Sequence, residues 1–126
     1  MQGQNIDILI QEADQLLNSA INEISRSEED VTTFMVCQNS RQSIINYLAS
    51  YLIKNDVSLK EPVTLASLLS QCRDLDGRFD LIDISQIFCR HDEEDEEYCL
   101  NVQKVNSCLN VAKQTRVIAL SEAPPY

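Results

Sequence analysis

The sequence predicts an all-α fold, an up-and-down bundle of four to five helices that forms one domain over residues 1–120. Three observations favour this class. Apolar residues recur at helical spacing over long stretches, only two glycines and three prolines are present to form turns, and 44% of the 126 residues are hydrophobic. A chain of this length buries about two thirds of its unfolded surface, which is enough for one core. Residues 121–126, SEAPPY, are expected to form a flexible tail.

The first helix is expected from Ile6 to about Ser25, because apolar residues follow one another at steps of three and four. This stripe consists of Ile6, Ile10, Ala13, Leu17, Ala20 and Ile24. Ser27 and the three acids after it provide a cap and an acidic first turn for a second helix, which runs to about Lys54. The stripe of the second helix consists of Val31, Phe34, Ile45, Leu48 and Leu52, and it passes through Gln38 and Arg41.

The second half of the chain is expected to contain two short helices and one long helix. After the linker KNDVSLKEP, Thr64 caps the helix LASLLSQCRDL, whose inward residues are Leu65, Leu68, Leu69 and Cys72. The segment DLDGRFD is typical of a turn. DLIDISQIFC is expected to be helical, because a single strand would have nothing to pair with. The last helix begins within the acidic run and continues to about Leu120, with the stripe Tyr98, Val102, Val105, Leu109 and Ala112.

Composition narrows the choice of partner and location. The 20 acids exceed the 10 lysines and arginines and give a net charge of −10, which disfavours broad binding to nucleic acid and favours partners with basic surfaces. Neither a secretion signal nor a membrane span is expected. The five cysteines lack CxxC spacing, so reduced thiols in the cytoplasm are expected. No cofactor is expected, because two glycines cannot form a glycine-rich phosphate loop.

Three segments resemble the HEPN family, whose members are compact helical-bundle domains. SRQSIINYLASYLI is similar to the small-and-apolar stretch of the family's second helix. PVTLASLL resembles its proline-containing linker and leucine-rich short helix. FCRHDEEDEEYCLNVQKVNSCLNVAKQ resembles its arginine-and-acid loop and last helix. The resemblance covers about residues 6 to 118.

The resemblance implies a dimer, and a ribonuclease only where the family's active-site motif is present. Many HEPN proteins are metal-independent ribonuclease toxins paired with a nucleotidyltransferase, and they use an arginine, four to six residues and a histidine. Here the single histidine, His91, follows Arg90 directly, and the nearest earlier arginine is Arg78. Six acids follow His91, which is unfavourable for a phosphate. The departure indicates a non-catalytic, binding or antitoxin-like member.

The acidic run after His91 has three interpretations. It is the loop and first turn of the last helix, where acids interact favourably with the helix dipole, or it is a docking surface for a basic partner. The acids are Asp92, Glu93, Glu94, Asp95, Glu96 and Glu97. A third, weaker interpretation is a metal site, because helical spacing places His91, Asp95 and Cys99 on one face.

Polar residues elsewhere suggest two binding sites. Gln38, Arg41 and Gln42 form a polar band on the second helix, which is either a structural salt bridge or a cleft for a nucleotide or partner. Arg73, Arg78 and Arg90 are candidates for an anion site at one end of the bundle. Tyr47 and Tyr51 are expected to pack at the edge of the core or, if exposed, to anchor a dimer.

The leading hypothesis is a cytoplasmic HEPN-like domain without catalysis of its own. It would bind a protein partner or a nucleotide in a toxin–antitoxin-type or regulatory system, alone or as a homodimer. Two alternatives stay open: a divergent HEPN ribonuclease that uses Arg90 and His91, and an unrelated helical adaptor.

Overall fold

The computed structural model describes residues 2–26, 33–60, 63–82 and 102–120. Within these ranges the chain forms α1 (Gln2–Ile24), α2 (Thr33–Lys54), α3 (Leu65–Leu75), the 3-10 helix η2 (Gly77–Leu81) and α4 (Val102–Leu120). No strand is present among these residues, so the predicted all-α helical bundle is confirmed. None of the helices described is both long and apolar enough to span a bilayer.

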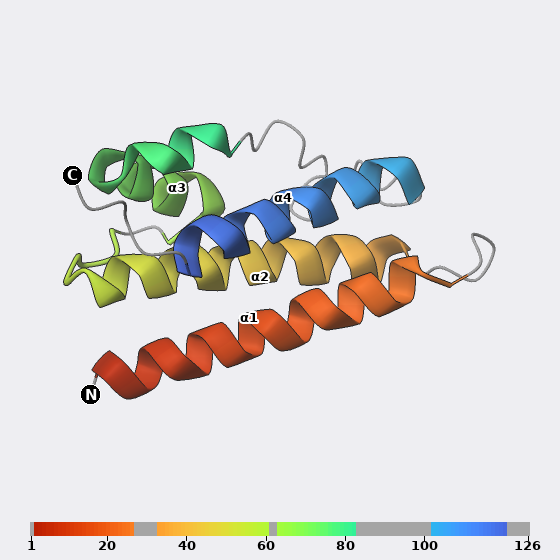
Figure 1. The fold of residues 1–126 in the computed structure, drawn as a ribbon, viewed down its shortest axis with the longest axis horizontal. Coiled ribbons are helices and arrows are strands. Elements are labelled where there is room, and N and C mark those ends of the chain that lie inside the picture. Colours follow the sequence, from red (N-terminus) through yellow and green to blue (C-terminus); the bar gives the residue numbers. More distant parts are fainter. Residues whose placement is uncertain (1, 27–32, 61–62, 83–101, 121–126) are drawn as a thin grey trace.

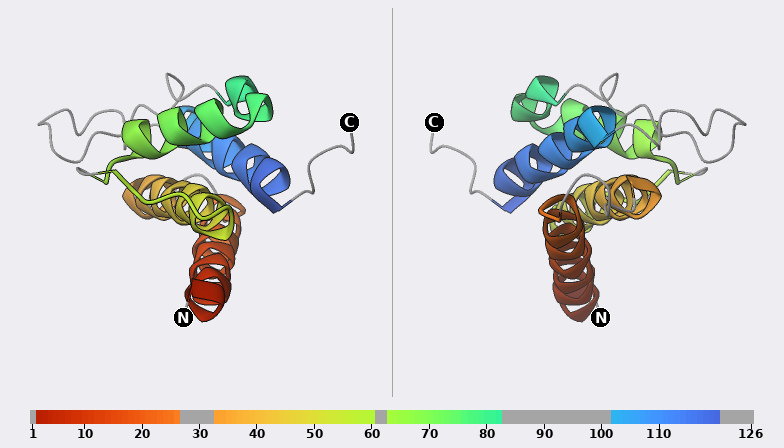
Figure 2. Two further views of the ribbon diagram at one scale, coloured as in Figure 1. Left: turned by 90° about the vertical axis from the view of Figure 1, so that its left-hand side faces the viewer. Right: turned by 90° about the vertical axis from the view of Figure 1, so that its right-hand side faces the viewer.

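Helix α2 is the central element of the bundle. It contacts α1, α3 and α4, and Figure 1 shows it between α1 on one side and the other two helices on the other. The views along the bundle in Figure 2 place α1 and α3 on opposite sides of α2. A helix covered on several sides buries residues around much of its circumference. The buried hydrophobic residues of α2 are Val36, Cys37, Ile44, Tyr47, Leu48, Ala49, Tyr51 and Leu52.

Buried serines account for the polar middle of α2. Ser40, Ser43 and Ser50 are all buried. The Ser43 hydroxyl donates a hydrogen bond to the backbone carbonyl of Ser40 (2.7 Å), and the Ser50 hydroxyl donates to that of Tyr47 (2.8 Å). A hydroxyl that bonds to its own helix can be buried at little cost. The small side chains also leave room for the neighbouring helices to approach.

The predicted stripe of the second helix is therefore wrong in its middle. Gln38 is exposed and Arg41 is half-buried, so these residues lie beside the core and do not interrupt it. Leu48 and Leu52 are buried as predicted, and Ile45 is half-buried. The stripe was traced through apolar residues alone, whereas serines occupy core positions here. Ser27, Val31 and the side chain of Phe34 lie outside the described residues.

Helix α1 packs along α2 through the predicted stripe. Ala13, Leu17 and Ala20 are buried, and Ile6, Ile10 and Ile24 are half-buried at the ends of the stripe. Two of the three buried residues are alanines, which permit close contact with α2. The opposite face of α1 is exposed, which is consistent with its position at the edge of the bundle (Figure 2).

Residues 55–60 are the described part of the connection that follows α2, and hydrogen bonds hold both of its ends. Helix α2 ends in a Schellman motif, in which the N–H of Val57 bonds to the carbonyl of Leu52 (2.9 Å) and Asp56 adopts a left-handed conformation with a φ of 60°. The buried side chain of Gln71 on α3 then holds the linker. Its Nε2 donates to the Ser58 carbonyl (2.9 Å), and its Oε1 accepts from the Lys60 N–H (3.2 Å).

Helix α3 has the bounds and the cap that the sequence predicts. The Thr64 hydroxyl accepts a hydrogen bond from the N–H of Ser67 (3.1 Å), and the predicted inward residues are buried: Leu65, Leu68, Leu69 and Cys72. The expected turn DLDGRFD contains the last residues of α3 and most of η2. Ile82 is extended and buried, so the expected helix DLIDISQIFC does not include it, and residues 83–90 lie outside the described ranges.

Helix α4 packs along α2 and completes the core. Leu109 and Ala112 are buried as predicted, and the buried Thr115 hydroxyl bonds to the carbonyl of Val111 (2.8 Å). Residues 83–101 and 121–126, which include the acidic run and the expected tail, lie outside the described residues. So do the side chains at positions 98, 102 and 105 of the predicted stripe.

Replacement of the buried serines of α2 should distinguish a satisfied hydroxyl from an unsatisfied one. The Ser40 hydroxyl is buried without a hydrogen-bond partner among the described residues. We expect Ser40→Ala to leave the free energy of unfolding unchanged or to raise it by up to about 1 kcal/mol, because an unsatisfied polar group is removed. Ser43→Ala should lower it by about 0.5–1 kcal/mol, because a hydrogen bond is lost. Urea denaturation measures both, and a larger loss in Ser40→Ala than in Ser43→Ala would contradict this assignment.

Candidate functional site

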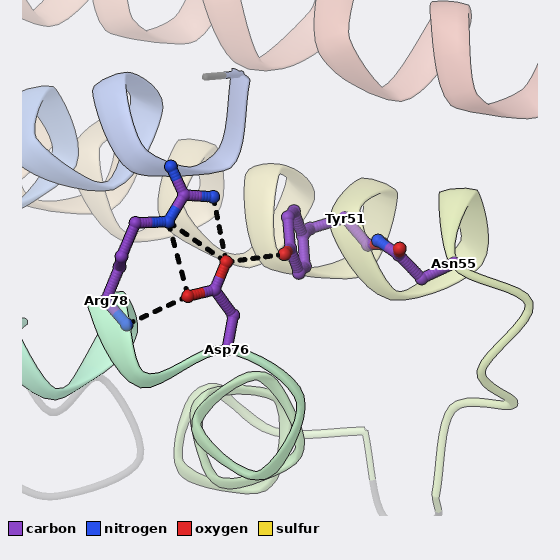
Figure 3. A network of polar contacts seen from close by, with 4 residues as sticks. All are labelled: Tyr51, Asn55, Asp76 and Arg78. Carbon is purple, nitrogen blue, oxygen red and sulfur yellow. Dashed lines mark hydrogen bonds and ion pairs between the residues drawn. The ribbon is translucent and has the colours of Figure 1, made fainter. Parts of the chain in front are cut away.

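A polar corner forms where α2 meets the junction of α3 and η2. Asp76 lies at this junction and accepts hydrogen bonds from the Tyr51 hydroxyl (2.8 Å), the Arg78 backbone N–H (2.9 Å) and the Arg78 guanidinium (2.8–3.2 Å). Figure 3 shows the two side chains converging on the carboxylate from opposite sides. The Asp76 backbone N–H donates to the Cys72 carbonyl (2.8 Å) and caps the end of α3, while its carboxylate caps η2, so one residue ends one helix, begins the next and binds the central helix.

The charges in this corner stabilise one another. Hydrogen bonds from the Arg78 side chain hold the pKa of Asp76 at about 2, below its ordinary value of 3.8. Burial and the Asp76 carboxylate raise the pKa of Tyr51, so its hydroxyl remains a donor. The ring of Tyr51 packs edge-on against buried Phe79, with 4.8 Å between ring centroids.

Asn55 lies beside the corner and belongs to the end of α2. Its side-chain Nδ2 donates to the carbonyl of Tyr51 (2.8 Å), as its position in Figure 3 indicates. The same carbonyl also accepts a hydrogen bond from the Asn55 backbone N–H (3.2 Å), so Asn55 binds the last turn of α2 twice.

Two of the three arginines proposed for an anion site lie in this region. Arg78 pairs with Asp76 through Nη2 and Oδ2 (2.8 Å). The guanidinium of Arg73 donates to the backbone carbonyls of Ile82 (2.6 Å) and Phe79 (3.4 Å), and its Nε lies 3.8 Å from Asp80. Both side chains therefore bind groups of η2 and its flanks. Arg90 lies outside the described residues, and the anion site stays a prediction.

A second network joins three helices. Asp14 on α1 accepts hydrogen bonds from the Tyr47 hydroxyl of α2 (2.5 Å) and from Nε of Arg116 on α4 (3.0 Å). Burial alone would raise the pKa of Asp14, but the bonds from Tyr47 and Arg116 lower it below its ordinary value. Burial and the bond to Asp14 raise the pKa of Tyr47 well above its ordinary value. The carboxylate is thus ionised and the phenol protonated at neutral pH.

The sequence pattern did not point to Asp14, Asp76 or Arg116. Tyr47 and Tyr51 were expected at the edge of the core, and both are buried with their hydroxyls bonded to a carboxylate. A buried tyrosine needs a partner for its hydroxyl, which is the one signal that could have prompted a search for these acids.

The predicted polar band on α2 lies apart from the corner. Gln38 and Gln42 are exposed and Arg41 is half-buried. Gln42 Nε2 donates to Asn46 Oδ1 along the helix (3.0 Å). Arg41 and Tyr51 are separated by about 15 Å along the helix axis at 1.5 Å per residue. The binding role of the band stays a prediction.

A shallow pocket lies between the linker and α3. Its volume is about 200 Å³, and its lining residues are Val57, Lys60, Gln71, Asp74 and Leu75. None of the residues predicted to bind a ligand lines it. Within the described ranges, no group of three or more potential metal ligands is present, and His91, Asp95 and Cys99 lie outside those ranges.

The cysteines are not all reduced thiols, contrary to the expectation. Cys37 is buried and disulfide-bonded, whereas Cys72 is a buried free thiol, and Cys108 is buried as well. Burial, with a smaller contribution from the Asp76 charge, raises the pKa of Cys72 to about 12. Its thiol is therefore protonated and unreactive at neutral pH.

Acid should destabilise the protein through Asp76. The pKa of Asp76 is lower in the folded chain than in the unfolded chain, so protonation favours unfolding. This contribution is present above about pH 4 and is lost towards pH 2, and it amounts to about 1–2 kcal/mol. Asp76→Asn should lower the free energy of unfolding at pH 7 by about 1–3 kcal/mol and flatten the decline below pH 4. Asp80→Asn is the control, with an expected loss below about 1 kcal/mol. Equal losses at pH 7 would contradict this role of Asp76.

The two hydrogen bonds to Asp14 in the three-helix network should contribute unequally to the free energy of unfolding. Tyr47→Phe should cost about 1–2 kcal/mol of unfolding free energy, because a buried hydrogen bond to a carboxylate is lost. Arg116→Gln should cost less than about 1 kcal/mol, because the Arg116 side chain is 45% exposed. Urea denaturation of both variants and of the double variant gives their coupling. A greater cost for Arg116→Gln would show that the surface pair dominates.

Both networks neutralise their charges inside the fold, and both join helices that are distant in sequence. Their geometry is that of structural ties, with no described nucleophile or titrating base between them. Comparisons with protein-family models, with curated proteins and with solved structures find no match.

Proposed function

We propose that this chain is a HEPN-like helical domain that acts by binding a protein partner and has no catalysis of its own. Two segments of the resemblance support it. SRQSIINYLASYLI forms the middle and end of α2, the central helix, and PVTLASLL leads into the Thr64-capped α3. The all-α bundle supplies the fold class that the proposal requires.

The observation that carries the proposal is the pairing of Asp14 and Asp76 inside the fold, where each carboxylate accepts hydrogen bonds from a tyrosine and an arginine. General acid–base catalysis needs groups that titrate near neutral pH. Here the pKa values of Tyr47 and Cys72 are raised and those of Asp14 and Asp76 are lowered, so each shift moves the group further from neutrality. These groups hold fixed protonation states and support the fold.

The described pocket beside α3 does not favour a nucleotide. Small-molecule sites usually enclose about 300–1,000 Å³, whereas this pocket measures about 200 Å³ and is open. The guanidinium groups of Arg73 and Arg78 already bind carboxylates and carbonyls, which makes them poor phosphate ligands.

The partner we propose has a basic surface. The net charge of −10 attracts such a surface and speeds association. The acidic run, residues 92–97, is the densest cluster of acids in the chain and is the proposed docking surface. A homodimer and a cytoplasmic location complete the proposal.

A charge-matched pair of variants tests the docking surface. One variant replaces five acids of the run by their amides: Asp92, Glu93, Glu94, Asp95 and Glu96. The other replaces five exposed acids elsewhere: Asp7, Glu12, Asp56, Asp74 and Asp80. Binding of a labelled lysine- and arginine-rich peptide is measured by fluorescence anisotropy.

The net charge changes equally in both variants, so any difference reports the position of the acids. We expect the first variant to bind about tenfold more weakly than the second. Equal weakening would mean that the peptide senses only the overall charge, and the run would then not be the docking surface. In a parallel assay, cleavage of single-stranded RNA by the wild type that disappears in His91→Ala would overturn the non-catalytic proposal.

A further inference from the structure

The shallow pocket beside α3 is lined by residues of one helix face and of the linker, residues 55–60. Gln71, Asp74 and Leu75 have the spacing i, i+3 and i+4, which places them together on the surface of α3. Val57 and Lys60 of the linker supply the rest of the lining. The pocket therefore contains no member of the two hydrogen-bonded networks.

Hydrogen bonds hold the pocket in one shape. The side chain of Gln71, a residue that is 7% exposed, bonds to the backbone of Ser58 (2.9 Å) and of Lys60 (3.2 Å). The N–H of Val57 bonds to the Leu52 carbonyl at the end of α2 (2.9 Å). The linker cannot leave α3 without breaking these bonds. A site that is already held in shape loses little conformational freedom when a partner binds.

The size of the pocket suits one side chain. Val57 is half-buried and Leu75 is 44% exposed, so both offer apolar surface whose burial favours binding. An apolar cavity of about 150 Å³ holds one benzene molecule, and the volume here is about 200 Å³. The space therefore fits a single leucine-sized group. Because the pocket is open, such a group can be carried on a longer chain that continues past the rim.

Two exposed charges of opposite sign line this pocket. Lys60 and Asp74 are both exposed, and neither forms a salt bridge with another described residue. The charge of the lining is therefore zero, in contrast to the −10 of the whole chain. A wholly basic segment would be attracted by Asp74 but repelled by Lys60. The lining instead complements a segment that carries one acid and one base.

Gln71 has hydrogen-bonding capacity left for the backbone of such a segment. Its Nε2 carries two hydrogens and donates one bond to a described residue, and its Oε1 accepts one of two bonds. The second hydrogen and the second lone pair match the carbonyl and the N–H of a peptide bond. A peptide satisfies them, whereas a simple hydrocarbon does not.

We propose that this pocket is an anchor site for a protein partner. Its occupant is a leucine-sized apolar side chain in a segment with one basic neighbour, which contacts Asp74, and one acidic neighbour, which contacts Lys60. The inference rests on the proposed binding of a protein partner and adds a contact of different chemistry from the acidic run. A few side chains buried in pockets carry most of the binding energy of many interfaces.

A neutral peptide tests the pocket through the NMR signals of the protein. The probe is a capped peptide with one leucine between a glutamate and a lysine, in both orders of the charges, titrated into the isotope-labelled full chain. We expect the largest chemical-shift changes at the Gln71 side-chain amide and at the backbone amides of Lys60 and Leu75. Replacement of the leucine of the peptide by serine should remove them. Largest changes elsewhere, or none in a large excess of peptide, would overturn the proposal.

Charge reversal separates a direct contact from general electrostatics. Asp74→Lys should weaken binding of the neutral peptide about tenfold, because its lysine is then repelled. Asp7→Lys changes the net charge equally on α1, across α2 from the pocket, and should have little effect. A peptide with glutamate in place of its lysine should bind Asp74→Lys more tightly than the wild type. Equal weakening in the two variants, or no such preference, would contradict the contact.

The apolar wall has its own matched pair of variants. Leu75 is 44% and Leu81 68% exposed, so truncation of either should leave the fold intact, as circular dichroism can verify. Leu75→Ala should weaken binding of the leucine peptide several-fold, and Leu81→Ala, outside the pocket, should not. Equal binding by the two variants would refute the anchor. Free leucine that binds as tightly as the peptide would refute it too, because the site would then recognise an amino acid.

Two probes keep the failure of the pocket apart from the failure of the docking surface. The neutral peptide reports on the pocket, and the lysine- and arginine-rich peptide reports on the acidic run. Binding of the basic peptide alone refutes the anchor site and supports the docking surface. Binding of the neutral peptide alone supports the anchor site and refutes the docking surface.

Discussion

The hydroxyl groups of Tyr47 and Tyr51, one turn apart on α2, connect the central helix to every other described helix. Tyr47 donates to Asp14 of α1, which also binds Arg116 of α4, and Tyr51 donates to Asp76 between α3 and η2. Because their rings are buried, the hydroxyls need partners. The acids that supply these partners also end or join the neighbouring helices. The arrangement of the bundle around α2 therefore depends on two phenol–carboxylate bonds.

These bonds fix the positions of the neighbouring helices along α2, which apolar packing alone would not fix. Hydrophobic packing is non-directional, and several helix arrangements could bury the same stripes. A carboxylate that must reach one particular hydroxyl restricts how far α1 or the α3–η2 corner can slide along α2. The buried serines add to this selection, since larger side chains at Ser40 or Ser43 would keep the neighbouring helices apart.

Local features of the sequence predicted local structure well. The stripe of α1, the Thr64 cap and the bounds of α3 each depend on residues within a few positions of one another. The bonds that join different helices in the two networks connect residues 25, 33 and 102 positions apart, and a single sequence does not identify which acid each tyrosine will meet. The prediction for the middle of α2 was wrong for a different reason. A serine whose hydroxyl bonds to its own helix can be buried in the core, although serine is classed as a polar residue.

The same contrast between local features and long-range contacts applies to the inference of function. The two described networks hold Asp14 and Asp76 in fixed pairs with arginine and tyrosine side chains, which is the arrangement expected of a scaffold. For the proposed binding role, the net charge of −10 favours a partner with a basic surface.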